Sequence, residues 1–253
     1  MNPGLTTCKN CGNHFEGKFC NLCGQSAEIK RFRTIHLLTS FLKSFIKLDS
    51  GHIYTVQQLF IQPGDMLRGY LSGKRVRYTN PTTYLIIVSA VTAYLITYSG
   101  LIDHAEDTLF NSANHLNFVV QHLSIRMFLA IPVYVILGKI FYSSYHYNVA
   151  EHFIINTFIA SQATFLIGIW MIVLIIFRSL EIMYKIIPVC FLATMMIYQV
   201  VVFFQFFKSE SSWQSWVKVI SFVILGFVIN MTIVRTLFHH DFPITSKYWE
   251  FIK

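Results

Sequence analysis

Four cysteines near the start of the chain have the spacing of a metal site. They form two CxxC pairs separated by eight residues: Cys8, Cys11, Cys20 and Cys23. Four thiolates at this spacing favour a tetrahedral Zn²⁺ site with no position open for a substrate, so the predicted metal is structural. Glycine follows each pair, at Gly12 and Gly24, and permits a tight backbone turn over the thiolates. Residues 1–28 are therefore predicted to form a zinc ribbon.

Two disulfides are the alternative for the same four cysteines. A reducing cytoplasm disfavours them. The segment also contains almost no aliphatic side chains that could form a core, so metal binding is expected to supply its folding free energy. The fifth cysteine, Cys190, lies alone in an apolar run and is expected only to pack.

A basic cluster in the sequence GKRVRY is a candidate site for anionic lipid headgroups. Lys74, Arg75 and Arg77 lie a few residues before the first long apolar run, where an arginine can hold a phosphate with two hydrogen bonds. The alternative is that these residues only anchor the chain at the membrane surface and set its orientation.

Carboxylates and imidazoles supply a weaker candidate for acid–base or metal chemistry. Asp49 and His52 precede the first apolar run, and Glu151 and His152 follow two predicted crossings, so all four are expected on one side of the membrane. If they converge, they form a catalytic or divalent-metal group. The alternative is that Glu151 and His152 only cap a helix and form hydrogen bonds.

The composition shows what must position these groups. The chain of 253 residues is 54% hydrophobic and only 13% charged, whereas soluble domains carry roughly 25% charged residues. Five apolar runs have about the length of a membrane-crossing helix. The expected fold is an all-α integral membrane bundle of about five helices: 81–102, 124–145, 152–177, 186–207 and 217–238. Polar residues inside these runs are expected to hydrogen-bond between helices: Asn156, Gln162, Gln199 and Asn230.

The segment 29–80 is predicted to be a basic, amphipathic region at the membrane surface. Apolar residues recur at helical spacing from Ile35 to Ile46, which favours a helix on the membrane or packed against the bundle. A second short helix is expected over 55–61, ending before Pro63, and the glycine-rich stretch up to the first span is expected to form turns. Residues 81–240 form the membrane domain, and 241–253 form a short tail.

The distribution of charge predicts the orientation. Lysine and arginine are concentrated before residue 81, whereas the segment after the first span is acidic and contains neither. The rule that positive segments stay inside places the N-terminus in the cytoplasm of a bacterial-type inner membrane, and five crossings place the C-terminus outside. The first thirty residues lack the apolar core of a secretory signal, so the later spans are expected to direct insertion. The net charge of +8 then reflects membrane orientation, and nucleic acid is not the expected partner.

Several of these features occur together in a known family. The order CxxC, CxxCGQ, a basic amphipathic segment, DSGHIYT, QP, GYLSGKRVRYTNPTTYL and YHYNVAEHF resembles an uncharacterised bacterial family, the domain of unknown function three-six-six-seven. The resemblance extends to about residue 165. It implies a zinc ribbon joined to a small helical membrane domain, and it implies no activity.

Three classes of function remain after this reading. The first is a membrane scaffold or interaction protein, with anionic lipids as partners and a cytoplasmic protein bound through the ribbon. The second is a lipid-modifying enzyme with its active site at the level of the headgroups. A small permease is the third, and whether the protein is an enzyme stays open.

Overall fold

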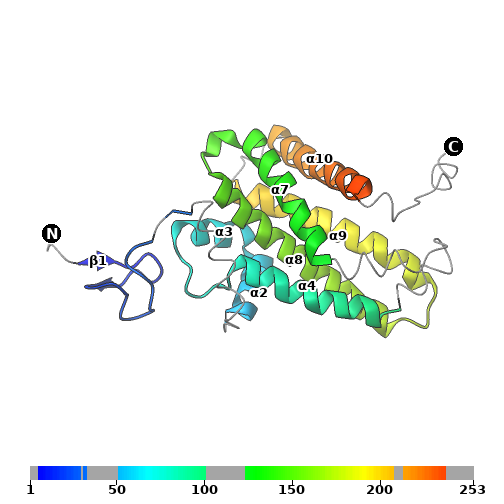
Figure 1. Cartoon of the computed structure of the whole chain (residues 1–253), viewed down its shortest axis with the longest axis horizontal. Helices are drawn as coiled ribbons and strands as arrows, with labels where there is room; N and C mark the ends of the chain where they lie inside the picture. The colour runs from blue at the N-terminus through cyan, green and yellow to red at the C-terminus, as the bar shows by residue number, and fades with distance from the viewer. Residues whose placement is uncertain (1–4, 30, 33–50, 101–122, 208–212, 238–253) are drawn as a thin grey trace.

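A computed structural model of the chain describes residues 5–29, 31–32, 51–100, 123–207 and 213–237. These residues form a bundle of helices with a small N-terminal module at one end (Figure 1). The helix expected from Ile35 to Ile46, the tail 241–253 and Asp49 lie outside the described residues.

The N-terminal module is built from two short hairpins. Strand β1 (Thr6–Thr7) pairs antiparallel with β2 (His14–Phe15). A single bridge between Phe19 and Ser26 closes the second hairpin. One CxxC pair lies in each hairpin, so both turns present cysteines to the space between them.

Two short helices follow the N-terminal module. Helix α2 (His52–Ile61) ends before Pro63, as the proline predicts. Helix α3 (Pro63–Ser72) occupies the stretch that was expected to form turns, and this expectation was wrong. Proline at the first helical position and burial of Leu67 and Tyr70 against the bundle outweigh the low helix propensity of the glycines.

Within the described residues, five long helices overlap the five predicted spans. Four of them, α4, α8, α9 and α10, have the length and hydropathy to cross a membrane, whereas the apolar stretch found in α7, Leu129–Phe141, is shorter than these. Their bounds are α4 (Pro81–Tyr98), α7 (Leu123–Phe141), α8 (Val149–Ile176), α9 (Ile182–Phe206) and α10 (Trp213–Leu237).

Helix α8 is at the centre of the bundle. It packs against α4, α7 and α9, while α10 packs against α7 and α9, and α3 packs against α9 (Figure 1). Half of the residues in the α4 and α8 spans are buried within the protein, compared with less than a quarter in α9 and α10. The apolar outer surfaces of α9 and α10 therefore suit contact with lipid.

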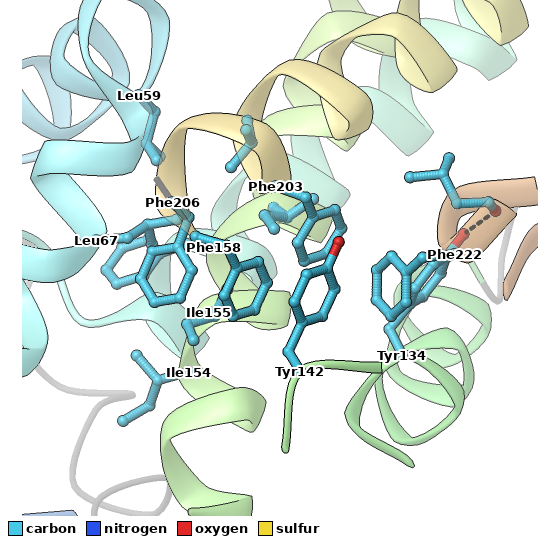
Figure 2. Close-up of a cluster of buried hydrophobic side chains, with 14 of the residues drawn as sticks. Leu59, Leu67, Tyr134, Tyr142, Ile154, Ile155, Phe158, Phe203, Phe206 and Phe222 are labelled. Carbon is cyan, nitrogen blue, oxygen red and sulfur yellow. Dashed lines mark hydrogen bonds between the residues drawn. The ribbon is translucent and has the colours of Figure 1, made fainter. Parts of the chain in front are cut away.

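An aromatic cluster fills the bundle near the end that the N-terminal module contacts. Figure 2 shows Phe158, Phe203, Phe222 and Tyr142 pointing toward one another from three different helices and the turn after α7. The ring centroids of Phe203 and Phe222 are 4.7 Å apart in an edge-on arrangement, which is a favourable geometry for aromatic pairs.

Polar side chains join the central helices inside this apolar bundle. Tyr84 of α4 donates a hydrogen bond to Gln162 Oε1 of α8 at 2.5 Å, so Gln162 bonds between helices as predicted. Asn156 does not follow that prediction, because its amide donates to His152 O within α8. A polar side chain can bond back to the carbonyl one turn earlier in its own helix, which the sequence pattern alone does not show.

Candidate metal centre

The two cysteine turns have the same backbone hydrogen bonds. In the first, the Gly12 N–H donates to Cys8 O at 2.9 Å and the Cys8 N–H donates to Asn13 O at 2.8 Å. The second repeats these bonds at the same distances, with Cys20, Gly24 and Gln25 in the corresponding positions. Gly12 and Gly24 have φ angles of +77° and +74°. Only glycine adopts this left-handed conformation without strain, which explains its place after each pair.

The four sulfur atoms lie together between the turns. All are within 4.8 Å of one another, with Cys8 Sγ 3.5 Å from Cys23 Sγ and Cys11 Sγ 3.7 Å from Cys20 Sγ. Tetrahedral coordination with Zn–S bonds of about 2.3 Å requires sulfurs roughly 3.8 Å apart. The residues present therefore fit a tetrahedral metal ion. Within the part of the chain that the structure describes, this is the one cluster of three or more ligating side chains close enough to share an ion.

The backbone around the thiols favours their ionised form. Burial raises the pKa of the Cys20 thiol, but the N–H groups of Cys23 and Leu22 that point at its sulfur outweigh this effect and lower the pKa to about 6. At Cys11 the N–H of Asn13 lowers the pKa, but burial and the neighbouring thiols together have the larger, opposite effect and raise the pKa to about 12. Four thiolates this close repel one another, and a bound dication removes that repulsion.

The turn after α7 holds two of the other candidate residues, at the start of α8. Glu151 forms a capping box with Asn148: the Asn148 side chain accepts the Glu151 N–H at 2.9 Å, and Glu151 Oε2 accepts the Asn148 N–H at 2.8 Å. Arg31 also donates two hydrogen bonds to the Glu151 carboxylate, at 2.6 and 2.7 Å. Glu151 thus has the capping role that the sequence left open, together with an ion pair.

His152 is buried beside α7. A methyl group added at Gly138 would come within 2.7 Å of His152 Nδ1, so the glycine allows the imidazole to fit against α7. The ring of Tyr147 meets the imidazole edge-on, with 6.2 Å between centroids. Among the described residues, Glu151 and His152 have contacts with Arg31, Asn148 and Tyr147, and His52 begins α2. Asp49 lies outside the described residues, so convergence of the four stays a prediction.

The three residues of the basic cluster have different environments. Lys74 and Arg77 are exposed, whereas Arg75 is only partly exposed. The Arg75 guanidinium carbon lies 3.7 Å from the centroid of the Phe32 ring, and Arg75 Nε donates to Tyr70 O at 3.2 Å. Arg75 therefore serves packing, and Lys74 and Arg77 are the two free to meet a headgroup.

One comparison with known proteins gives a match, over a segment that includes this cluster. Residues 49–93 match the model of the family described as a protein of unknown function (DUF3667). Over these residues the chain is similar to this family. The match confirms the family that the sequence resembled, over α2, α3 and most of α4. No curated protein and no solved structure matches the chain.

In the structure, the matched segment closes one end of the bundle. A methyl group added at Gly64 would come within 2.6 Å of the Gln205 backbone, so α3 can approach the end of α9 only with glycine there. Arg68 donates to Phe206 O at 2.7 Å and to Gln205 O, and it pairs with Asp65 at 2.6 Å. The last carbonyls of α9 are satisfied in this way. Arg68 was not singled out in the sequence, where it is one of the cations before residue 81, and the Gly-x-x-x-Arg spacing from Gly64 was the available signal.

Proposed function

We propose that the protein is a multi-pass protein of a bacterial-type inner membrane that displays a structural Zn²⁺ ribbon as a docking module on its cytoplasmic face. The observation that carries the proposal is the closed set of four thiols, with Cys8, Cys11, Cys20 and Cys23 mutually within 4.8 Å. Four protein ligands fill a tetrahedral ion, so no position is left for a substrate. A centre of this kind stabilises the fold of the ribbon and therefore the surface that the ribbon displays.

The surface of the ribbon supports docking of another protein. Phe19 and Leu22 belong to the second cysteine hairpin, and they are 64% and 71% exposed. Apolar side chains with this exposure are common in protein interfaces. Lys9 and Lys18 balance Glu16 and Glu28 in charge, so Zn²⁺ with four thiolates gives the ribbon a net charge of minus two. A cytoplasmic partner with an apolar patch and a positive rim is complementary to it.

The proposed orientation is supported by cations gathered at the end of the bundle near the ribbon. Arg68 caps α9, Lys139 Nζ donates to Tyr147 O at 2.9 Å, and Lys218 Nζ lies 4.9 Å from the Tyr142 ring centroid. Positive residues favour the cytoplasmic side.

A reporter that is active only outside the cytoplasm should be silent when fused at residue 28 and active when fused after residue 115. The opposite pattern contradicts the orientation.

The bundle also supports contact with anionic lipid through Lys74 and Arg77. Both lie between α3 and α4, at the proposed depth of the headgroups, and both are exposed.

The alternative function, a lipid-modifying enzyme, is less well supported. The carboxylate of Glu151 is already shared between the start of its own helix and Arg31, so a role in acid–base chemistry requires it to leave two partners.

The metal content of the purified protein tests the proposal. Wild type should carry one zinc per chain, and a Cys20→Ser, Cys23→Ser double variant should lose it while still inserting into membrane. Cys190→Ser is the matched control, because it removes a thiol from α9 and should keep the zinc. Equal zinc in wild type and the double variant ends the proposal.

Docking has a separate readout. A photoreactive amino acid at position 22 should form protein-sized adducts in cells, and Phe19→Ser should remove them without loss of zinc. Adducts that form equally in the Phe19→Ser variant, or only with lipid, contradict a protein partner at this surface.

A further inference from the structure

Among the described residues, three points of contact join the ribbon and the two residues after it to the bundle, and the first involves the cysteine turn itself. Lys9 lies between Cys8 and Cys11 in the first turn, and Ile29 follows the second hairpin. A methyl group added at Gly73 would lie 3.0 Å from Ile29 Cδ1 and 3.3 Å from Lys9 Cδ. The ribbon therefore contacts the turn after α3, and Figure 1 shows it at that end of the bundle.

The second contact is the ion pair between Arg31 and Glu151. The Arg31 side chain is 63% exposed, whereas that of Glu151 is 6% exposed. Arg31 also donates to His146 O at 2.9 Å. His146 has a φ of +53°, a left-handed conformation that is uncommon for residues other than glycine. Removing Arg31 leaves a buried carboxylate without its cation and a strained turn without its donor.

The third contact is the side chain of Phe32. Its ring stacks on Tyr70 with centroids 5.9 Å apart and 9° between planes, and Arg75 lies over it. The Phe32 carbonyl accepts a hydrogen bond from Asn148 Nδ2 at 3.0 Å. Residues 31–32 are thus fixed to α3, to the turn before α4 and to the start of α8. We refer to Arg31 and Phe32, with these contacts, as the latch.

The contact at Gly73 requires a folded ribbon, and the latch holds the ribbon close to Gly73. Lys9 and Ile29 can lie against Gly73 only when the ribbon is folded, and a segment with so little core is folded only with its metal. The latch holds the chain two residues beyond Ile29, so it raises the effective concentration of the ribbon at Gly73. The folded, metal-bound ribbon and the closed latch therefore stabilise each other.

We propose that the latch couples the metal state of the ribbon to the end of the membrane bundle, with Glu151 as a positioning residue for a metal more than a hundred positions away in the chain. This rests on the proposed zinc ribbon and adds its regulation. Coupling between two sites is reciprocal: if metal closes the latch, then an intact latch retains the metal. Loss of metal frees the ribbon, together with its docking surface, from the bundle.

Zinc retention in the full-length protein tests the coupling. Arg31→Gln and Phe32→Ala should each lower the apparent zinc affinity about five- to tenfold in competition with a chromogenic chelator. The double variant should lose little more than either single one, because both remove one latch. Lys218→Gln is the control. It removes a cation from the same end of the bundle, and the side chain of Lys218 lies over Tyr142, which is not a latch residue.

Hydrogen–deuterium exchange tests the coupling in the reverse direction, from the metal to the end of the bundle. Chelation should increase exchange in residues 70–78 and 146–152 of wild type, while the Arg31→Gln variant should show raised exchange before chelation and little further change. Zinc bound by wild type and retained equally by both latch variants overturns the coupling and leaves the proposed function standing. Wild type without zinc overturns both.

Discussion

The ribbon and the helical bundle are stabilised in different ways. The buried residues of the ribbon are few, and two of the three that pack together, Cys8 and Cys20, are themselves candidate metal ligands, beside Phe15. The bundle buries an extended set of aliphatic and aromatic side chains and adds hydrogen bonds between helices. A region without a core gains its folding free energy from a metal ion, whereas helices in lipid gain theirs from packing and interhelical bonds. The two should therefore fail under different treatments.

Metal removal has the largest expected effect, because it removes the whole folding free energy of the ribbon. Lys9 and Lys18 are already exposed, so a strong chelator should unfold the backbone around them and allow trypsin to cleave there, while the helical circular dichroism of the bundle stays unchanged. The measurement is limited proteolysis with spectra recorded on the same sample. Loss of helical signal in step with the metal would mean that the two regions form a single cooperative unit.

Acid should release the metal from the ribbon and spare the bundle. The folded-state pKa of Cys20, about 6, lies below its ordinary value of 9.0. At Cys20 the folded ribbon therefore binds fewer protons than the unfolded one between these values, so the contribution of this thiol to stability rises with pH there. That stability is lost as pH falls through about 6, and protons also compete directly with the metal. Zinc release followed between pH 8 and 5 should rise as pH falls, and release that is independent of pH contradicts thiolate ligands.

A core substitution should do the reverse, weakening the bundle and leaving the metal in place. Phe222 is fully buried among aromatic rings, so Phe222→Ala should destabilise the bundle by about 3 to 5 kcal/mol. Ile224→Ala, half-exposed on the same helix, is the control and should cost far less. Thermal unfolding in detergent measures the change. Equal effects of the two substitutions would show that α10 does not pack as described.

Anionic lipid binding has the smallest expected effect and separates the surface cations of the two regions. Lys74→Gln and Arg77→Gln should each weaken the association by about 1 kcal/mol, the contribution of one basic residue near a charged membrane. Lys18→Gln, on the ribbon, should change nothing. Native mass spectrometry with anionic and zwitterionic lipids provides the comparison. An equal loss with Lys18→Gln would place the ribbon itself on the membrane.

The features that the sequence predicted are those set by local spacing. The CxxC pairs with their glycines determine a metal site within twenty residues of chain, and long apolar runs determine helices wherever they occur. Helix α3 was missed because Gly64 and Gly69 are typical of turns, whereas contact with α9 decides the outcome. Propensity was overridden by tertiary packing.

The contacts that position the ribbon could not be predicted, because their partners are far apart in the chain. Arg31 and Glu151 are 120 residues apart, and Arg68 and Phe206 are 138 apart. The same limit applies to Lys74 and Arg75, which are adjacent and chemically similar in sequence. The chain turns sharply at Gly73, with φ +116°, and only the folded turn shows that Arg75 lies over Phe32 while Lys74 stays exposed.

X-ray absorption at the zinc edge of the purified, full-length protein tests the central claim most directly. A closed structural centre predicts one zinc per chain with four sulfur neighbours at about 2.3 Å and no lighter ligand. The spectrum should be the same for wild type and Cys190→Ser. A nitrogen or oxygen neighbour in the first coordination sphere, or a stoichiometry well below one, would contradict a centre made only from Cys8, Cys11, Cys20 and Cys23.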